Sequence, residues 1–144
     1  MGKLTLSLCE KIIEEAFAKG AELGLKPLTV VVLDAGGHTI ALMRQDGSSI
    51  MRPQIASGKA FGALAVGQGS RWLDNDARNR PHFIQALNGA AGGNIVPVAG
   101  GVLVRDGEGG EIIGAVGITG DTSDNDEACA IAGITAAGFV ADGG

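Results

Sequence analysis

The sequence has few of the residues that mark specialised classes of protein. Its 144 residues include no tyrosine, one tryptophan, four phenylalanines, four prolines and two cysteines. So few prolines, without a Gly-X-Y period, exclude collagen. No apolar run approaches the ~20 residues needed to span a bilayer, and no signal-peptide pattern occurs at the N-terminus. We therefore expect a cytoplasmic protein that does not enter the membrane and whose core is aliphatic.

Charge and motif content exclude further classes. The formal net charge is −5, and the few basic residues form no stripe with aromatic neighbours, so nucleic-acid binding is not expected. Cys9 and Cys129 lie far apart and outside any CxxC pattern, which favours free, buried thiols. No phosphate-binding loop, zinc-protease motif or nucleophile elbow occurs. Generic motifs therefore assign no chemistry.

A length of 144 residues fits one domain, over residues 1–144. Hydrophobic periodicity predicts that this domain is of the α/β class and α+β type. A helix capped by Thr5 or Ser7 is followed by two β-branched runs around an Asp/Gly turn, which is typical of a β-hairpin. Helical patterns then begin near Pro53, and a second hairpin and a last helix complete the chain. Since hairpins pair antiparallel strands, we expect an antiparallel sheet covered by helices. The remaining expected segments are helices at 71–80 and 81–87, an apolar segment at 95–104, a strand at 112–118 and a helix from about 122. Pro97 and the Gly100-Gly101 pair indicate that the apolar segment contains an edge strand, a bulge or a bent entry to a strand.

Glycine is the most over-represented residue, with 25 among 144, where ~7% is usual. Gly114, Gly117 and Gly120 recur every third residue in and after the strongest strand of the second half. Glycine weakens a strand, so its presence there indicates the close approach of another body. That body is a helix, a second subunit or a ligand.

Several segments, taken together and in order, resemble the GlcG/HbpS family, whose module also forms the C-terminal half of PduO-type proteins. The first is the hairpin turn with the strand before it, and the last runs from the second hairpin into the final helix. The match covers nearly the whole chain. The matching segments are residues 30–38, 43–47, Lys59-Ala60, 97–102, 114–120, Asp124 and 126–133.

The resemblance implies a profilin-like fold, with a central antiparallel sheet flanked by helices, and a homo-oligomer built from dimers into a tetramer or octamer. Some members bind haem, some accompany cobalamin chemistry, and some accompany glycolate or aromatic-acid use. The adenosyltransferase half of PduO is absent here. Two positions depart from the family pattern, Phe61 after Lys59-Ala60 and Asp121 after the last strand, and either departure could alter a pocket.

The first hairpin carries the candidate metal ligand. His38 opens its second strand, where an imidazole could ligate haem iron or transfer a proton near neutral pH. The alternative is a histidine that only faces solvent or the core. The residues before His38 either form the edge of a ligand pocket or serve only as turn residues. They are Asp34, Gly36 and Gly37.

A second candidate group is charged. Lys59 lies on an otherwise apolar helix face, so it either extends to water or is buried beside a carboxylate or a bound anion. Asp46 and Glu127 are its candidate partners. A buried lysine can act as base, acid or anion anchor, and we take Lys59, Asp46 and Glu127 as candidate catalytic residues. Arg44, at the end of a strand, is a candidate ligand-binding residue.

Two functions from different classes follow. The first is a cofactor-binding protein of the GlcG/HbpS type, with haem as ligand, held between the first hairpin and the helix that carries Lys59. Its candidate ligand-binding residues include Gly117. The second is an enzyme for a small carboxylate or oxo-acid. In it, Arg44 or Lys59 holds the carboxylate, and His38, Asp46 or Glu127 moves a proton. A scaffold without ligand is a third possibility.

Overall fold

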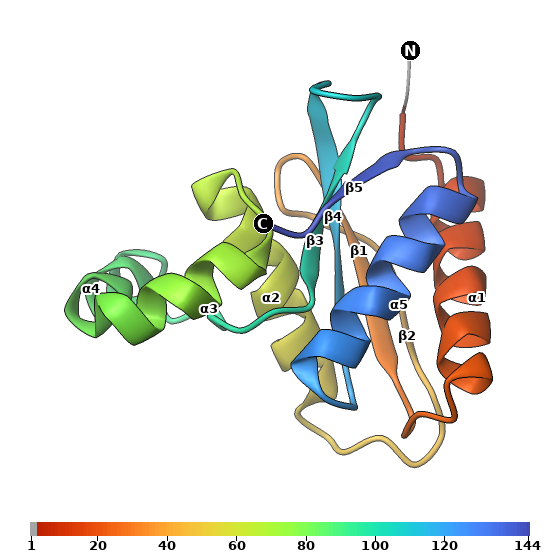
Figure 1. Cartoon of the computed structure of the whole chain (residues 1–144), viewed down its shortest axis with the longest axis horizontal. Coiled ribbons are helices and arrows are strands. Elements are labelled where there is room, and N and C mark those ends of the chain that lie inside the picture. The colour runs from red at the N-terminus through yellow and green to blue at the C-terminus, as the bar shows by residue number, and fades with distance from the viewer. Residues whose placement is uncertain (1–2) are drawn as a thin grey trace.

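The computed structural model describes residues 3–144, and the element order follows the predicted one (Figure 1). Two hairpins are each preceded and followed by helices, and a short terminal strand follows the last helix. The helices are α1 (Leu6–Glu22), α2 (Arg52–Val66), α3 (Ser70–Asn79), α4 (Pro81–Ala90) and α5 (Ser123–Ala136). The strands are β1 (Thr29–Asp34), β2 (Thr39–Arg44), β3 (Gly101–Arg105), β4 (Ile112–Thr119) and β5 (Val140–Asp142).

The strands form one antiparallel sheet in the order β2-β1-β4-β3-β5, which confirms the predicted α+β architecture. Figure 1 shows α1 and α5 side by side on one face, while α2 covers the other and α3 and α4 extend outward beyond it. Among the described residues, no helix is both long and apolar enough to cross a bilayer.

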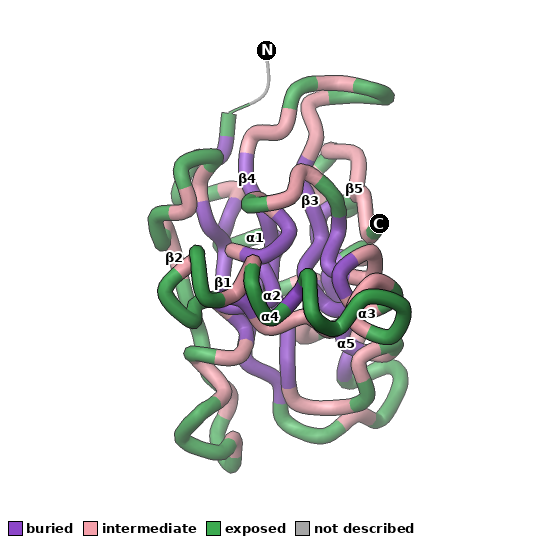
Figure 2. The backbone as a smooth tube through the Cα atoms, turned by 90° about the vertical axis from the view of Figure 1, so that its left-hand side faces the viewer, coloured by how far each residue is buried: buried purple, intermediate pink, exposed green. Residues whose placement is uncertain are grey.

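The continuous apolar run in β1 is explained by burial on both faces of the sheet. Val30 and Val32 belong to the core beneath α1 and α5, whereas Val31 and Leu33 pack beneath α2. Figure 2 shows the central strands buried and the outer helices largely exposed. The thiols of Cys9 and Cys129 are free and buried in the α1–α5 layer, as predicted, and burial raises the pKa of Cys129 to about 11.

The apolar segment before β3 is a bent entry to the strand, one of the three predicted alternatives. The strand begins only at Gly101, because the preceding residues pack along α2 instead of along a neighbouring strand. The amide of Val96 donates to the Gly58 carbonyl at 3.2 Å. A Cβ on Gly100 would lie 2.8 Å from the Lys59 Nζ. The short strand β5, on the far edge of the sheet, was not predicted.

The glycines of β4 are explained by packing within the chain. A Cβ on Gly117 would lie 2.0 Å from the Ala56 carbonyl oxygen, so the body that approaches it is α2. A Cβ on Gly114 would meet the Leu33 carbonyl oxygen at 2.4 Å, and one on Gly120 the Pro27 carbonyl oxygen at 2.1 Å. Gly117, a candidate ligand-binding residue in the sequence, is therefore buried beneath a helix.

We predict that Gly117→Ala destabilises the protein, because the added methyl group overlaps the backbone of α2. Overpacking of this kind costs about 1–3 kcal/mol or more. Gly89 in α4 is the matched control, because a Cβ there would meet nothing within 4 Å. Gly89→Ala should stabilise by about 0.5–1 kcal/mol. Urea unfolding measures both, and an unchanged midpoint for Gly117→Ala would contradict the packing.

Candidate functional site

A hollow of about 690 Å³ lies between the first hairpin and the outer face of α2. We call it the α2 hollow. Its wall from the hairpin is short, its longest wall is α2, and the segment before β3 closes the third side. The lining residues are Leu33, Gly37, Thr39, Met51, Pro53, Gln54, Ile55, Ser57, Gly58, Phe61, Gly93, Asn94 and Val96. This is where the sequence analysis expected the ligand.

Two glycines and one aromatic ring shape the α2 hollow. A Cβ on Gly37 would lie 3.4 Å from the Phe61 ring, and one on Gly58 would lie 2.5 Å from a Val96 methyl group. Gly58 therefore lets the segment before β3 close tightly on α2, whereas a Cβ on Gly37 would make only ordinary contact with Phe61. Phe61, one of the two departures from the family pattern, lines the hollow directly. The walls are mostly apolar, as is usual for sites that bind flat organic ligands.

His38 lies at the rim of the hollow, between the lining residues Gly37 and Thr39, and its side chain is 80% exposed. Its Nδ1 lies 3.1 Å from the Asp34 Oδ1. The backbone amides of His38 and Gly36 donate to the same oxygen, at 3.0 and 2.9 Å. These hydrogen bonds lower the pKa of the Asp34 carboxyl group, and the bond from the His38 amide contributes most.

An ionised carboxylate can only accept hydrogen bonds, so the Asp34 side chain favours the tautomer in which the His38 Nδ1 carries the proton. The Nε2 lone pair is then free to bind a metal. A carboxylate that orients a histidine in this way is the usual outer support of a metal-ligating imidazole. Within residues 3–144, no three His, Cys, Asp or Glu side chains gather to hold a bare metal ion. A single oriented imidazole can serve as the protein ligand of an iron ion that a macrocycle already coordinates.

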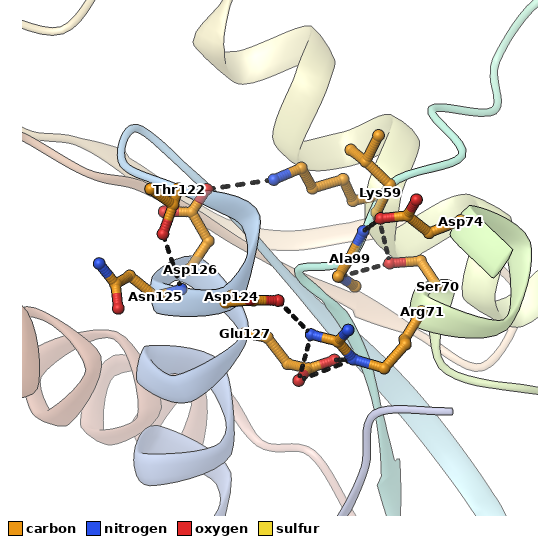
Figure 3. Close-up of polar contacts among 12 residues, drawn as sticks. Lys59, Ser70, Arg71, Asp74, Ala99, Thr122, Asp124, Asn125, Asp126 and Glu127 are labelled. Atoms are coloured by element: carbon orange, nitrogen blue, oxygen red, sulfur yellow. Dashed lines mark hydrogen bonds and ion pairs between the residues drawn. The ribbon is translucent and has the colours of Figure 1, made fainter. Parts of the chain in front are cut away.

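Lys59 lies on the opposite face of α2, toward the sheet, and does not line the hollow. Its Nζ donates to the Ile118 carbonyl at 2.9 Å and lies 3.2 Å from the Asp126 Oδ2. The two side chains are 3% and 1% exposed. Figure 3 shows Lys59 reaching from α2 toward the start of α5. Burial lowers the pKa of Lys59 and raises that of Asp126, and each charge partly offsets the effect on the other.

The loop before α5 holds Asp126 in place. The Asp121 amide donates to the Asp126 Oδ1 at 3.0 Å. The Asp121 carboxylate accepts from the Asn125 side chain and from the amides of Thr122 and Lys26. Together these bonds lower its pKa to about 2, with the Asn125 side chain contributing most. Asp121, the second departure from the family pattern, therefore stabilises the loop and does not line the α2 hollow.

The predicted partners of Lys59 are wrong. Glu127 instead makes a two-pronged ion pair with Arg71 of α3, at 3.0–3.2 Å, and Asp124 joins the same guanidinium at 2.6 Å (Figure 3). Successive residues of α5 point about 100° apart. Asp126 therefore faces α2, while Glu127 faces α3.

Asp46 and Arg44 lie elsewhere, beside a second hollow at the other end of β2. The three candidate catalytic residues are therefore not brought together: Lys59 is sealed against Asp126, Glu127 binds Arg71, and Asp46 is exposed at the end of the hairpin. The hairpin candidates Asp34, Gly36, Gly37 and His38 do form one cluster at the α2 hollow.

Sequence reasoning missed Asp126 as the partner of Lys59, as well as the polar lining residues Gln54, Ser57 and Asn94. A lysine on an apolar helix face does indicate a buried carboxylate. Which carboxylate depends on the turn between β4 and α5, which no local pattern specifies. Gln54 and Ser57 lie on the outer face of α2, one helical turn from Gly58 and Phe61, so helical spacing could have found them.

The comparisons with known proteins agree with this architecture. Residues 4–135 match the family described as "Haem degrading protein HbpS-like". The chain belongs to this family. It is also 30% identical over 123 residues to an "Uncharacterized 15.0 kDa protein in dhaT-dhaS intergenic region" of Citrobacter freundii, a match that covers 85% of this chain and 84% of that protein.

Solved structures show the same fold. The crystal structure of HbpS superposes with a TM-score of 0.79 at 26% identity, over 94% of this chain and 90% of that one. The crystal structure titled "PduOC:Heme Complex" superposes with a TM-score of 0.83 at 22% identity, covering 96% and 97%. The fold and family predicted from the sequence are thus confirmed.

We predict that Lys59→Met costs about 3–5 kcal/mol of the free energy of unfolding, because it leaves the Asp126 carboxylate buried without its cation. The double variant Lys59→Met/Asp126→Asn removes both charges and should cost clearly less than the sum of the two single variants. Denaturant unfolding of all four proteins gives the coupling energy. Additive single-variant costs would contradict a direct interaction.

Proposed function

We propose that this HbpS-like protein binds haem in the α2 hollow, with the His38 Nε2 as a ligand of the iron. The observation that carries the proposal is the Asp34–His38 pair at the rim of a largely apolar hollow. The pair presents a free imidazole nitrogen beside walls that suit a flat macrocycle. The description of the family and the haem complex of a structural neighbour support the same ligand class.

Each part of the hollow has a role in this proposal. Phe61, Ile55 and Val96 supply apolar surface for the macrocycle, and Thr39 and Gln54 supply hydrogen-bond donors for its carboxylates. Asp34 is a positioning residue that keeps the His38 Nδ1 protonated. Bound haem would supply a redox-active iron, whose properties the axial ligand and its hydrogen bonds adjust.

Titration with hemin tests the proposal. The wild-type protein should shift the Soret band and saturate, while His38→Ala should lose the histidine-ligated spectrum. Asp34→Asn should weaken binding about 10–100-fold, as is typical when the outer support of a metal ligand is removed. His82→Ala is the matched control, because His82 is exposed on α4.

A blocking variant separates ligation from occupancy of the hollow. Ser57→Phe places a ring inside the hollow and leaves the His38 residue itself unchanged, and it should prevent the Soret shift. If His38→Ala binds hemin with an unchanged spectrum, the ligand assignment is wrong. If Ser57→Phe binds hemin as tightly as the wild type does, the site is wrong.

We also propose that the protein forms a homo-oligomer built from dimers, as a tetramer or octamer. Ile50 and Met51 are adjacent before α2 and are 83% and 56% exposed, and Leu42 is exposed on the edge strand β2. Exposed apolar side chains of this kind mark protein–protein surfaces. Sedimentation velocity should show an oligomer that Ile50→Glu dissociates and that Leu6→Glu, at an exposed residue of α1, leaves intact. A monomeric wild type at micromolar concentration would contradict it.

A further inference from the structure

Two arginines have no carboxylate partner among the residues that the structure describes. Arg52 donates to hydroxyl groups instead, at 2.8 Å to the Thr119 Oγ1 and at 3.1 Å to the Ser49 Oγ. Arg44 makes neither a side-chain hydrogen bond nor an ion pair within residues 3–144. The other arginines each form an ion pair with an aspartate or a glutamate. They are Arg71, Arg78, Arg80 and Arg105.

The strand register brings the two unpaired arginines to the same end and the same face of the sheet. Thr29, the first residue of β1, pairs with Arg44 on one side and with Thr119 on the other. Side chains paired across strands share a face, with Cβ atoms about 5 Å apart. This is the face on which α2 packs, because Val31 contacts α2 there. Arg52, in the first turn of α2, bonds to Thr119, so Thr29 lies between the two arginines.

The same end of the sheet holds hydroxyl groups without partners. Within the described part of the chain, the buried side-chain oxygen or nitrogen atoms that lack a hydrogen bond are the Thr29 Oγ1 and the Ser48 Oγ. Ser48 lies in the loop from β2 to α2, which passes this end of the sheet (Figure 1). A buried hydroxyl without a partner is costly and calls for an explanation. We call Thr29, Arg44, Ser48, Arg52 and Thr119 the arginine corner.

The charge of the arginine corner is positive and not balanced within the described chain. Burial lowers the pKa of Lys59 most, and the nearby charge of Arg52 lowers it further, while Asp126 opposes both. The Asp126 carboxylate is already paired with Lys59, so it does not neutralise Arg52. Asp46, two residues after Arg44, is exposed and forms no ion pair with it in residues 3–144. The corner therefore offers several hydrogen-bond donors and no carboxylate to accept from them.

We propose that the arginine corner binds a phosphate dianion, either free or as a phosphomonoester. Its oxygen atoms accept from the guanidiniums of Arg44 and Arg52, and its two negative charges balance theirs. Each guanidinium donates a fork of two hydrogen bonds, and a phosphate has enough oxygen atoms for two forks, whereas one carboxylate satisfies one. The hydroxyls of Thr29 and Ser48 gain an acceptor in the same oxygen atoms. His38 lies at the opposite end of β2, so this site is separate from the haem site proposed above.

Calorimetric titration of the full chain with inorganic phosphate, at constant ionic strength, tests the proposal. The wild-type protein should bind one phosphate per chain. Arg44→Gln and Arg52→Gln should each weaken binding about tenfold, because each removes charge-assisted hydrogen bonds. Arg44 is exposed and makes no polar contact within residues 3–144, so its variant should fold normally. Arg78→Gln is the matched control, because the Arg78 side chain is 78% exposed on α3, and it should bind phosphate like the wild type.

Thermal unfolding provides a second readout, which includes the buried hydroxyl. Phosphate should raise the unfolding temperature of the wild type, because it binds the folded state, but not that of the double variant Arg44→Gln/Arg52→Gln. Thr29→Val keeps the shape of the side chain and removes the hydroxyl. It should raise the unfolding temperature without phosphate, because an unpartnered polar group is lost, and it should weaken phosphate binding about threefold.

The outcomes distinguish the arginine corner from the haem site and from other anions. Phosphate binding that Arg44→Gln weakens and His38→Ala leaves unchanged supports the proposal. Acetate that binds as tightly as phosphate would overturn the assignment of a dianion. No binding at millimolar phosphate, or binding that survives the loss of both guanidiniums, would overturn the site, whatever a hemin titration shows. Phenyl phosphate separates the two sources: tighter binding than inorganic phosphate supports a phosphomonoester, and equal or weaker binding supports the free ion.

Discussion

The buried ion pair between Lys59 and Asp126 is the interaction on which the rest of the structure depends. It joins α2, the end of β4 and the first turn of α5 through one ammonium group. Neither charge is stable in this environment alone, because burial disfavours each charged form. The pair therefore fixes which face of α2 points to the sheet. By the same geometry it fixes which face is left to line the α2 hollow.

Glycine makes this arrangement possible. The ammonium group reaches the Ile118 carbonyl only because α2 lies unusually close to the sheet, and Gly117 removes the side chain that would hold the two apart. Gly100 gives the Lys59 side chain its space from the other direction. Several glycines of the second half are therefore contact points between backbones, whereas others have open space around them. The first group includes Gly100, Gly101, Gly114, Gly117, Gly120 and Gly133.

The sequence predicts the elements well and the site in part. The hairpins, the helices and the cap at Thr5 follow from local patterns, because turn and cap chemistry acts within a few residues. The Asp34–His38 cluster is also local, spanning one turn. The partner of Lys59 is 67 residues away, and neighbouring acidic residues of α5 face different helices. Only the tertiary arrangement selects Asp126 over Glu127.

The first residues of β2, with the turn before them, offer an oriented imidazole beside an apolar hollow, and we propose that haem binds there. A crystal structure of the protein grown with hemin tests it: we expect the iron bonded to the His38 Nε2 and the macrocycle against Phe61. Haem bound away from α2, or iron without His38 as a ligand, would contradict the account.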